Sequence, residues 1–189
     1  MRSPLRLVLA LLVLGGAASP PSVRYEVAAG SQFWIDGNAT TGRWTCQADA
    51  VRGHGLVGEA HELAAQVTVP VRDFDCGSGP MNRDLYHALA AEAHPAITFD
   101  LDTAETLREA PAGGWARVRA TGTLRLAGVA RRVTVDAEGR RLATNRVALR
   151  GEHRLRMTDF DVTPPSHALG LVRAHDAIRV RFDLTATAR

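Results

Sequence analysis

The stretch FDCGSGPMNRDLYHALAAEAHPAITF, from Phe74 to Phe99, contains the clearest change of periodicity in the sequence. On either side of it, apolar residues tend to recur at every second position. Within it, four apolar residues follow the spacing i, i+4, i+7 and i+8 of one helical face: Met81, Leu85, Ala88 and Leu89. The pattern predicts one short helix over residues 81–91, inserted between strands.

Turn residues and prolines mark both ends of this helix. Cys76 to Pro80 supplies glycines, a serine and a proline near the first helical turn, where a missing N–H costs little. The dipeptide His94-Pro95 returns the chain to extended geometry. An amphipathic helix with no helical partner must bury its apolar face against a sheet or cover the open end of a barrel.

Segments with alternating apolar and polar residues fill the rest of the chain and predict strands. Ala127-Gly128 joins the clearest pair of them as a hairpin, and Pro70 indicates an edge or bulged strand. The segment from Gly53 to Gly58 is rich in glycine, and its register is not readable. The predicted strands span residues 22–27, 31–37, 43–48, 63–74, 97–102, 117–126, 129–135, 146–157 and 177–186.

Short links between amphipathic strands favour an all-β, antiparallel fold. About eight such strands close most naturally into a β-barrel, because closure removes the sheet edges. A barrel of that size has an interior that is either filled by side chains or holds one small ligand. A β-sandwich is the main alternative.

Residues 1–18 have the pattern of a secretory signal peptide: a basic start, an apolar run and small residues before Pro20. The apolar run is too short to span a membrane, which takes ~20 residues. Residues 19–189 then form a single exported domain, periplasmic or secreted. Without Arg2 and Arg6 the chain has 21 arginines against 20 acidic residues, a net charge of +1, so its composition does not indicate a nucleic-acid partner. Nothing in the sequence predicts the oligomeric state.

Cys46 and Cys76 are the only cysteines. An even number of cysteines in an exported chain favours a disulfide, with two buried thiols as the alternative. A bond would close a loop of about 30 residues and contribute ~3 kcal/mol by restricting the unfolded chain.

Three motifs together resemble the YceI-like family of exported, lipocalin-like proteins. They are residues 121–129 (TGTLRLAGV), residues 94–99 (HPAITF) after the helix, and residues 157–165 (MTDFDVTPP). The resemblance covers nearly all of the chain after the leader and is loosest over residues 33–58. It implies a lipocalin-like β-barrel that holds an isoprenoid-like lipid, such as a polyprenyl or quinone-type molecule. It brings no catalytic signature and no cofactor beyond such a bound lipid.

A lipid tail needs an apolar lining and few polar anchors, because each buried CH₂ contributes ~0.8 kcal/mol. Inward-facing strand residues supply this lining, and three helix residues close one end. The predicted lipid-binding residues are Phe99, Leu101, Val118, Leu124, Leu149, His153, Leu155, Val180 and Phe182, with Met81, Leu85 and Leu89 at the closed end.

His153 is the ionisable residue on an otherwise apolar stripe, so it is a candidate to hydrogen-bond a headgroup or a quinone oxygen. The alternative is a neutral histidine satisfied by a neighbouring strand or by water. Asn82 and Arg83, near exposed N–H groups at the helix start, are further headgroup candidates, with solvated surface as the alternative. The histidines lack the spacings typical of metal or covalent haem sites.

Two other function classes remain open at this level. One is a lipid-modifying enzyme that uses His153 with Asp159 or Asp161, which requires these side chains to meet in a water-accessible cleft. The other is a ligand-free interaction module whose barrel has a collapsed core. The main hypothesis is a non-enzymatic lipid-binding protein for transport, storage or sequestration.

Overall fold

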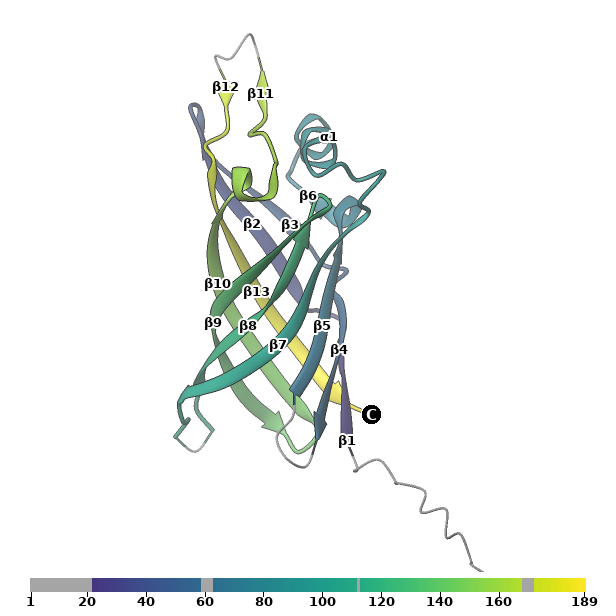
Figure 1. The fold of residues 1–189 in the computed structure, drawn as a ribbon, viewed down its shortest axis with the longest axis vertical. Helices are drawn as coiled ribbons and strands as arrows, with labels where there is room; N and C mark the ends of the chain where they lie inside the picture. The colour runs from purple at the N-terminus through teal and green to yellow at the C-terminus, as the bar shows by residue number, and fades with distance from the viewer. Residues whose placement is uncertain (1–21, 59–62, 112, 168–171) are drawn as a thin grey trace, which may run out of the picture.

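The computed structural model describes residues 22–58, 63–111, 113–167 and 172–189. The predicted signal peptide lies outside these residues. Most of the described chain forms strands that wind into one tall barrel, with the α-helix at one end (Figure 1).

Eight antiparallel strands close the barrel in the order β1-β4-β5-β7-β8-β9-β10-β13, and β13 pairs back onto β1. This confirms the predicted antiparallel β-barrel and excludes the β-sandwich. The strands are β1 (Ser22–Val27), β4 (Arg52–Gly58), β5 (Leu63–Pro70), β7 (Ala96–Arg108), β8 (Ala116–Leu126), β9 (Val129–Ala143), β10 (Arg146–Arg156) and β13 (Ala177–Ala188).

Strand β13 pairs with two different strands along the same edge. Its last residues pair with β1, whereas residues 179–183 pair with β2 (Gln32–Ala39). Strand β2 continues into β3 (Gly42–Ala48), and β3 pairs with the short β6 (Phe74–Asp75). These three strands extend the wall toward the helix end, where β11 (Ser166–His167) and β12 (Val172–Arg173) form a separate small hairpin (Figure 1).

The predicted strand over residues 63–74 is interrupted, and this is a correction to its length. Strand β5 ends at Pro70, and the 3₁₀-helix η1 (Val71–Asp73) follows. Proline lacks an N–H for a further ladder bond. The Val71 N–H instead donates to the Pro95 carbonyl at 2.9 Å, so the chain turns here under the helix. The glycine-rich segment whose register was unreadable forms β4.

Helix α1 (Gly79–Ala88) begins two residues earlier and ends three residues earlier than predicted. The Ser78 hydroxyl accepts a hydrogen bond from the Met81 N–H at 3.4 Å and caps the first turn. Ala90 has φ of 48°, a left-handed conformation that ends the helical path before His94.

The β8–β9 hairpin is confirmed with its predicted turn. Ala127 and Gly128 have φ of 47° and 84°, as a tight turn between twisted strands requires. A Cβ atom on residue 128 would lie 2.5 Å from Nε2 of His94, so this position accepts only glycine. The hairpin tip therefore packs beside the segment that follows the helix.

Fully buried apolar residues gather mainly at the helix end of the barrel. Phe74 in β6 and Phe160 in the 3₁₀-helix η2 (Met157–Phe160) are the largest of them, 1% and 2% exposed. Their neighbours in this cluster include Cys46, Val69, Val71, Leu89, Ile97, Leu126, Met157 and Val162. These residues form one buried apolar cluster near the helix.

Candidate functional site

The barrel encloses a cavity of about 860 Å³ lined by residues from all eight barrel strands. Ligand cavities in proteins span roughly 300–1,000 Å³, so this one lies near the upper end of that range. Residues of helix α1 and of β2 and β3 line its upper part. The prediction of a barrel with a collapsed core therefore does not describe this structure.

Inward-facing side chains explain why the interior stays hollow. Val118, Ala120 and Leu124 alternate along β8 toward the lumen, yet all three keep partial exposure because no residue fills the space in front of them. Alanine is frequent on this lining, and its small side chain leaves room in the centre. The lining alanines of the barrel strands are Ala65, Ala104, Ala116, Ala120, Ala137, Ala148 and Ala186.

Glycines on neighbouring strands let two aromatic rings lie close to the wall. A Cβ atom on Gly122 would lie 2.6 Å from Cζ of Phe99 in the adjacent strand β7. Gly151 and Phe182 repeat this arrangement between β10 and β13, also at 2.6 Å. The rings occupy the places of the missing side chains, so they line the cavity without blocking it.

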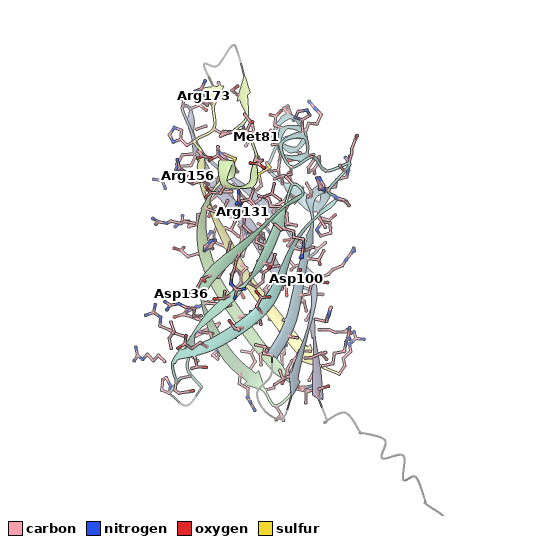
Figure 2. All side chains as sticks on the ribbon, viewed as in Figure 1. Met81, Asp100, Arg131, Asp136, Arg156 and Arg173 are labelled. Atoms are coloured by element: carbon pink, nitrogen blue, oxygen red, sulfur yellow. A yellow bond between two sulfur atoms is a disulfide. The ribbon has the colours of Figure 1, made fainter. Side chains whose placement is uncertain are left out.

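All twelve residues predicted to bind lipid line this cavity. Strand pairing places several of them at matching heights, for example Phe99 opposite Leu124 and His153 opposite Val180. Met81, Leu85 and Leu89 come from the helix end, and Figure 2 shows Met81 there. Contact with a ligand remains a prediction for each of them.

Sequence reasoning missed part of the lining. Trp44 lies across Gly37 of the neighbouring strand β2 and faces the cavity near the helix end. Tyr25 and Val133 also line it, and the alternation in β1 already placed Tyr25 on one face with Val23 and Val27. The glycine beneath Trp44 carried no readable signal, because cross-strand pairing depends on the register.

His153 lies midway along the inward stripe of β10 and is about half buried. Burial lowers the pKa of its imidazole below the ordinary value of 6.5, so the neutral form predominates at pH 7. Among the described residues, none forms a hydrogen bond or an ion pair with its side chain. Its two ring nitrogens are available to a ligand oxygen.

The other polar residues on the lining lie toward the rim or are exposed. Thr41, Arg43 and Asp84 are at the helix end, and Arg141 is near the opposite end of β9. Arg140 of β9 also lines the cavity, is partly buried and lies over the ring of Trp115, and its buried Nε has no hydrogen-bond partner in the described structure. Apart from His153 and Arg140, the partly buried part of the wall is almost entirely apolar.

Asn82 and Arg83 are not among the residues that line the cavity. The Asn82 side-chain oxygen accepts from the Cys76 N–H at 2.7 Å, and its amide donates to Asp75 at 3.2 Å. Asn82 thus holds the loop that leads into the helix. Arg83 is exposed on the helix surface.

Cys46 and Cys76 form a disulfide, which confirms the predicted bond and excludes two free thiols. The bond links β3 to the loop that precedes α1, and both cysteines lie on the cavity lining. It therefore fastens the helix that covers the cavity to the barrel wall.

Asp159 and Asp161 are exposed in and just after η2, and neither lines the cavity. Arg131 donates to the backbone carbonyl of Asp159 at 2.9 Å, and Asp161 ends η2 with φ of 56°. No hydrogen bond among the described residues joins either carboxylate to His153. The convergence that an enzyme built on these residues requires is not present in this arrangement.

The described part of the chain holds no group of three or more histidine, cysteine or acidic side chains placed to bind a metal ion. None of its helices is both long and apolar enough to cross a membrane.

The fold and its interior define a class of protein: a closed antiparallel β-barrel with an apolar cavity covered by one helix. A model of the YceI-like domain matches residues 23–186, which is most of the chain, so the protein belongs to the YceI-like family. No curated protein matches the sequence.

Solved structures of related proteins share the fold at low identity. BcnA from Burkholderia cenocepacia is 22% identical, with a TM-score of 0.66 over 83% of this chain and 96% of its own. A polyisoprenoid-binding domain from Saccharophagus degradans is 16% identical, with a TM-score of 0.68 over 87% of this chain and 98% of its own. A YceI protein from Campylobacter jejuni is 19% identical, with a TM-score of 0.56 over 68% of this chain and 74% of its own.

Proposed function

We propose that this protein is an exported, non-enzymatic binding protein that holds an isoprenoid-like lipid, polyprenyl or quinone-type, inside its barrel. The observation that carries the proposal is the cavity of about 860 Å³ with an almost entirely apolar wall. A similar structure is described as a polyisoprenoid-binding domain, and this likeness of fold is consistent with the same ligand class.

The physical chemistry of the wall suits a long, flexible hydrocarbon. Transfer of each CH₂ from water into such a cavity contributes ~0.8 kcal/mol, and no directional contact is needed. Rigid polar ligands would instead need several converging polar groups on the wall. The partly exposed leucines and valines of the lumen gain burial only when a guest covers them.

Export is supported by two features of different kind. The sequence of residues 1–18 has the pattern of a signal peptide. The Cys46–Cys76 disulfide fits an oxidising compartment such as the periplasm. In that setting a soluble carrier would shield a water-insoluble lipid during transport, storage or sequestration.

Native mass spectrometry of the protein purified from its own host tests the proposal. We expect a mass above that of the polypeptide, and the extracted ligand should fragment as an isoprenoid. Only the bare polypeptide mass, under conditions that keep known lipid carriers loaded, would contradict the proposal. Mature protein that begins near residue 19 in the same spectrum would confirm cleavage of the leader.

A further inference from the structure

The ladder of paired residues between β9 and β10 covers only part of the two strands. The ladder of these strands runs from Arg146–Ala143 to Gly151–Ala137 and stops there. Strand β10 nevertheless continues to Arg156 and remains paired with β13 along its whole length. Residues 129–136 of β9 are likewise paired with β8 alone in the described structure. We call the interval between residues 129–136 and 152–156 the seam.

The seam is bounded at both ends. Near the helix, Arg131 donates to the Asp159 carbonyl at 2.9 Å and ties β9 to η2. At the other limit, the ladder resumes at Gly151. Figure 2 shows Arg131 nearer to the helix end than Asp136, as this order requires. Backbone groups that face the seam lack a strand partner, so they bond to water or to a bound molecule.

A shallow outer pocket lies over the seam. Residues from both of its sides line this pocket: Arg119, Thr134, Asp136, Glu152, His153 and Arg154. His153 is the residue that this pocket shares with the interior cavity. His153 therefore borders both the apolar lumen and the outer surface of the wall.

The charges around the seam are balanced. Arg119 pairs with Asp136, with Nε and Oδ1 2.9 Å apart. Glu152 pairs with Arg179, with Oε2 and Nη1 3.6 Å apart. Two acidic and two basic side chains line the outer pocket, so no net charge there attracts an anion. A neutral imidazole both donates and accepts one hydrogen bond, which suits a hydroxyl, phenol or quinone oxygen.

We infer that the seam between β9 and β10 is a lateral headgroup site, where His153 hydrogen-bonds the uncharged oxygen of an amphiphile whose apolar tail lies in the lumen. The inference rests on the proposed function. It adds where the head lies, through the side wall rather than under the helix, and which chemistry it has, neutral rather than phosphate.

Distance-dependent quenching locates the head directly. The probe is a geranylgeranyl chain with a neutral nitrobenzoxadiazole head. Nitroxide labels are attached to Thr134→Cys at the seam, Thr41→Cys at the helix end and Asn145→Cys at the opposite end. Both native cysteines are bonded, so each label reacts only with the introduced thiol. We expect the label at position 134 to quench most strongly.

The position of the strongest quenching decides between a head at the side wall and a head at either end of the barrel. Stronger quenching from position 41 or 145 would overturn the lateral site while leaving the proposed function intact. Failure of the unlabelled protein to bind the probe would overturn the proposed function and the inference together.

A second experiment tests the chemistry of the head with His153→Leu. Geranylgeraniol should bind about tenfold more weakly than to the wild type, because one hydrogen bond is lost in a partly buried place. Squalene, which has no head, should bind equally well to both proteins. His153→Gln keeps a donor and an acceptor and should restore most of the affinity for the alcohol.

Two results would contradict this assignment. Equal weakening for the alcohol and for squalene would mean that His153 only packs against the tail. Geranylgeranyl phosphate that binds more than tenfold more tightly than the alcohol would contradict a neutral head. Thermal unfolding of each variant checks that the barrel is intact.

Discussion

Similar apolar residues have different surroundings in two regions, the buried cluster at the helix end and the cavity of the barrel interior. At the helix end, Phe74 and Phe160 are 1% and 2% exposed and form part of a solid core. Farther along the strands from the helix, Phe99, Val118 and Leu149 point inward as well but remain partly exposed around the cavity. An inward-facing apolar residue therefore becomes core or lining according to what stands opposite it.

The difference follows from which elements surround each region. Helix α1, η1, β6 and η2 lie together at the helix end (Figure 1), and η1, β6 and η2 contribute Val71, Phe74 and Phe160 to the buried cluster there. The remaining barrel has only its eight strands, and alanines and glycines are frequent on their inner faces. Packed cores approach the density of organic crystals, so a cavity of this size persists only where the chain supplies too few atoms.

Truncation of one phenylalanine in each region should produce the largest difference in the free energy of unfolding. Phe160→Ala should lower the free energy of unfolding by about 3–5 kcal/mol, because it opens a cavity in a filled core. Phe99→Ala should cost clearly less, because its ring already borders empty space. Urea titration of the lipid-free proteins measures both. Equal losses would contradict the distinction between the buried cluster and the cavity lining.

Removal of the disulfide tests the attachment of the helix to the wall. The double change Cys46→Ser and Cys76→Ser should lower the free energy of unfolding by ~3 kcal/mol. Hydrogen exchange should rise most in α1, while amides of β8 and β9 keep relative protection. Uniformly faster exchange would show that the bond supports the whole barrel rather than its closed end.

Filling the lumen should separate binding from stability. Ala120→Phe places a ring in the cavity and should weaken geranylgeraniol binding at least tenfold, while stability changes by less than about 1.5 kcal/mol. Ala64→Phe, on the exposed face of β5, is the matched control and should leave binding unchanged. A loss of several kcal/mol for Ala120→Phe would mean that the lumen has no spare room. Fluorescence titration and urea unfolding provide the two readouts.

The smallest expected effect concerns the pH dependence of stability through His153. Burial holds its folded-state pKa below the unfolded value near 6.5, so the unfolded chain binds the proton first as pH falls. Its contribution is complete above about pH 6.5 and declines toward the folded-state pKa. His153→Gln should flatten the curve in that window. Thermal unfolding at several pH values measures the difference, and parallel curves would contradict it.

The sequence pattern predicted the inward faces of several strands correctly but misplaced one strand end. Alternation in 117–126 and 146–157 correctly placed Val118, Leu124, Leu149 and Leu155 on inner faces, because the strand period of two depends only on neighbouring residues. Helix α1 was recognised from its i, i+4 spacing and its proline. The end of β5 was placed too late, because η1 forms through a bond from Val71 to Pro95, far away in sequence.

What the sequence determined by itself is the local pattern: which residues form strands, where the helix and the β8–β9 turn fall, and which side chains share a face. Only the tertiary structure decided which inward-facing residues are fully buried and which remain partly exposed around the cavity, and that the β9–β10 ladder stops before His153. Periodicity acts between near neighbours, whereas a cavity and a seam depend on strand register and on how many atoms meet across the barrel.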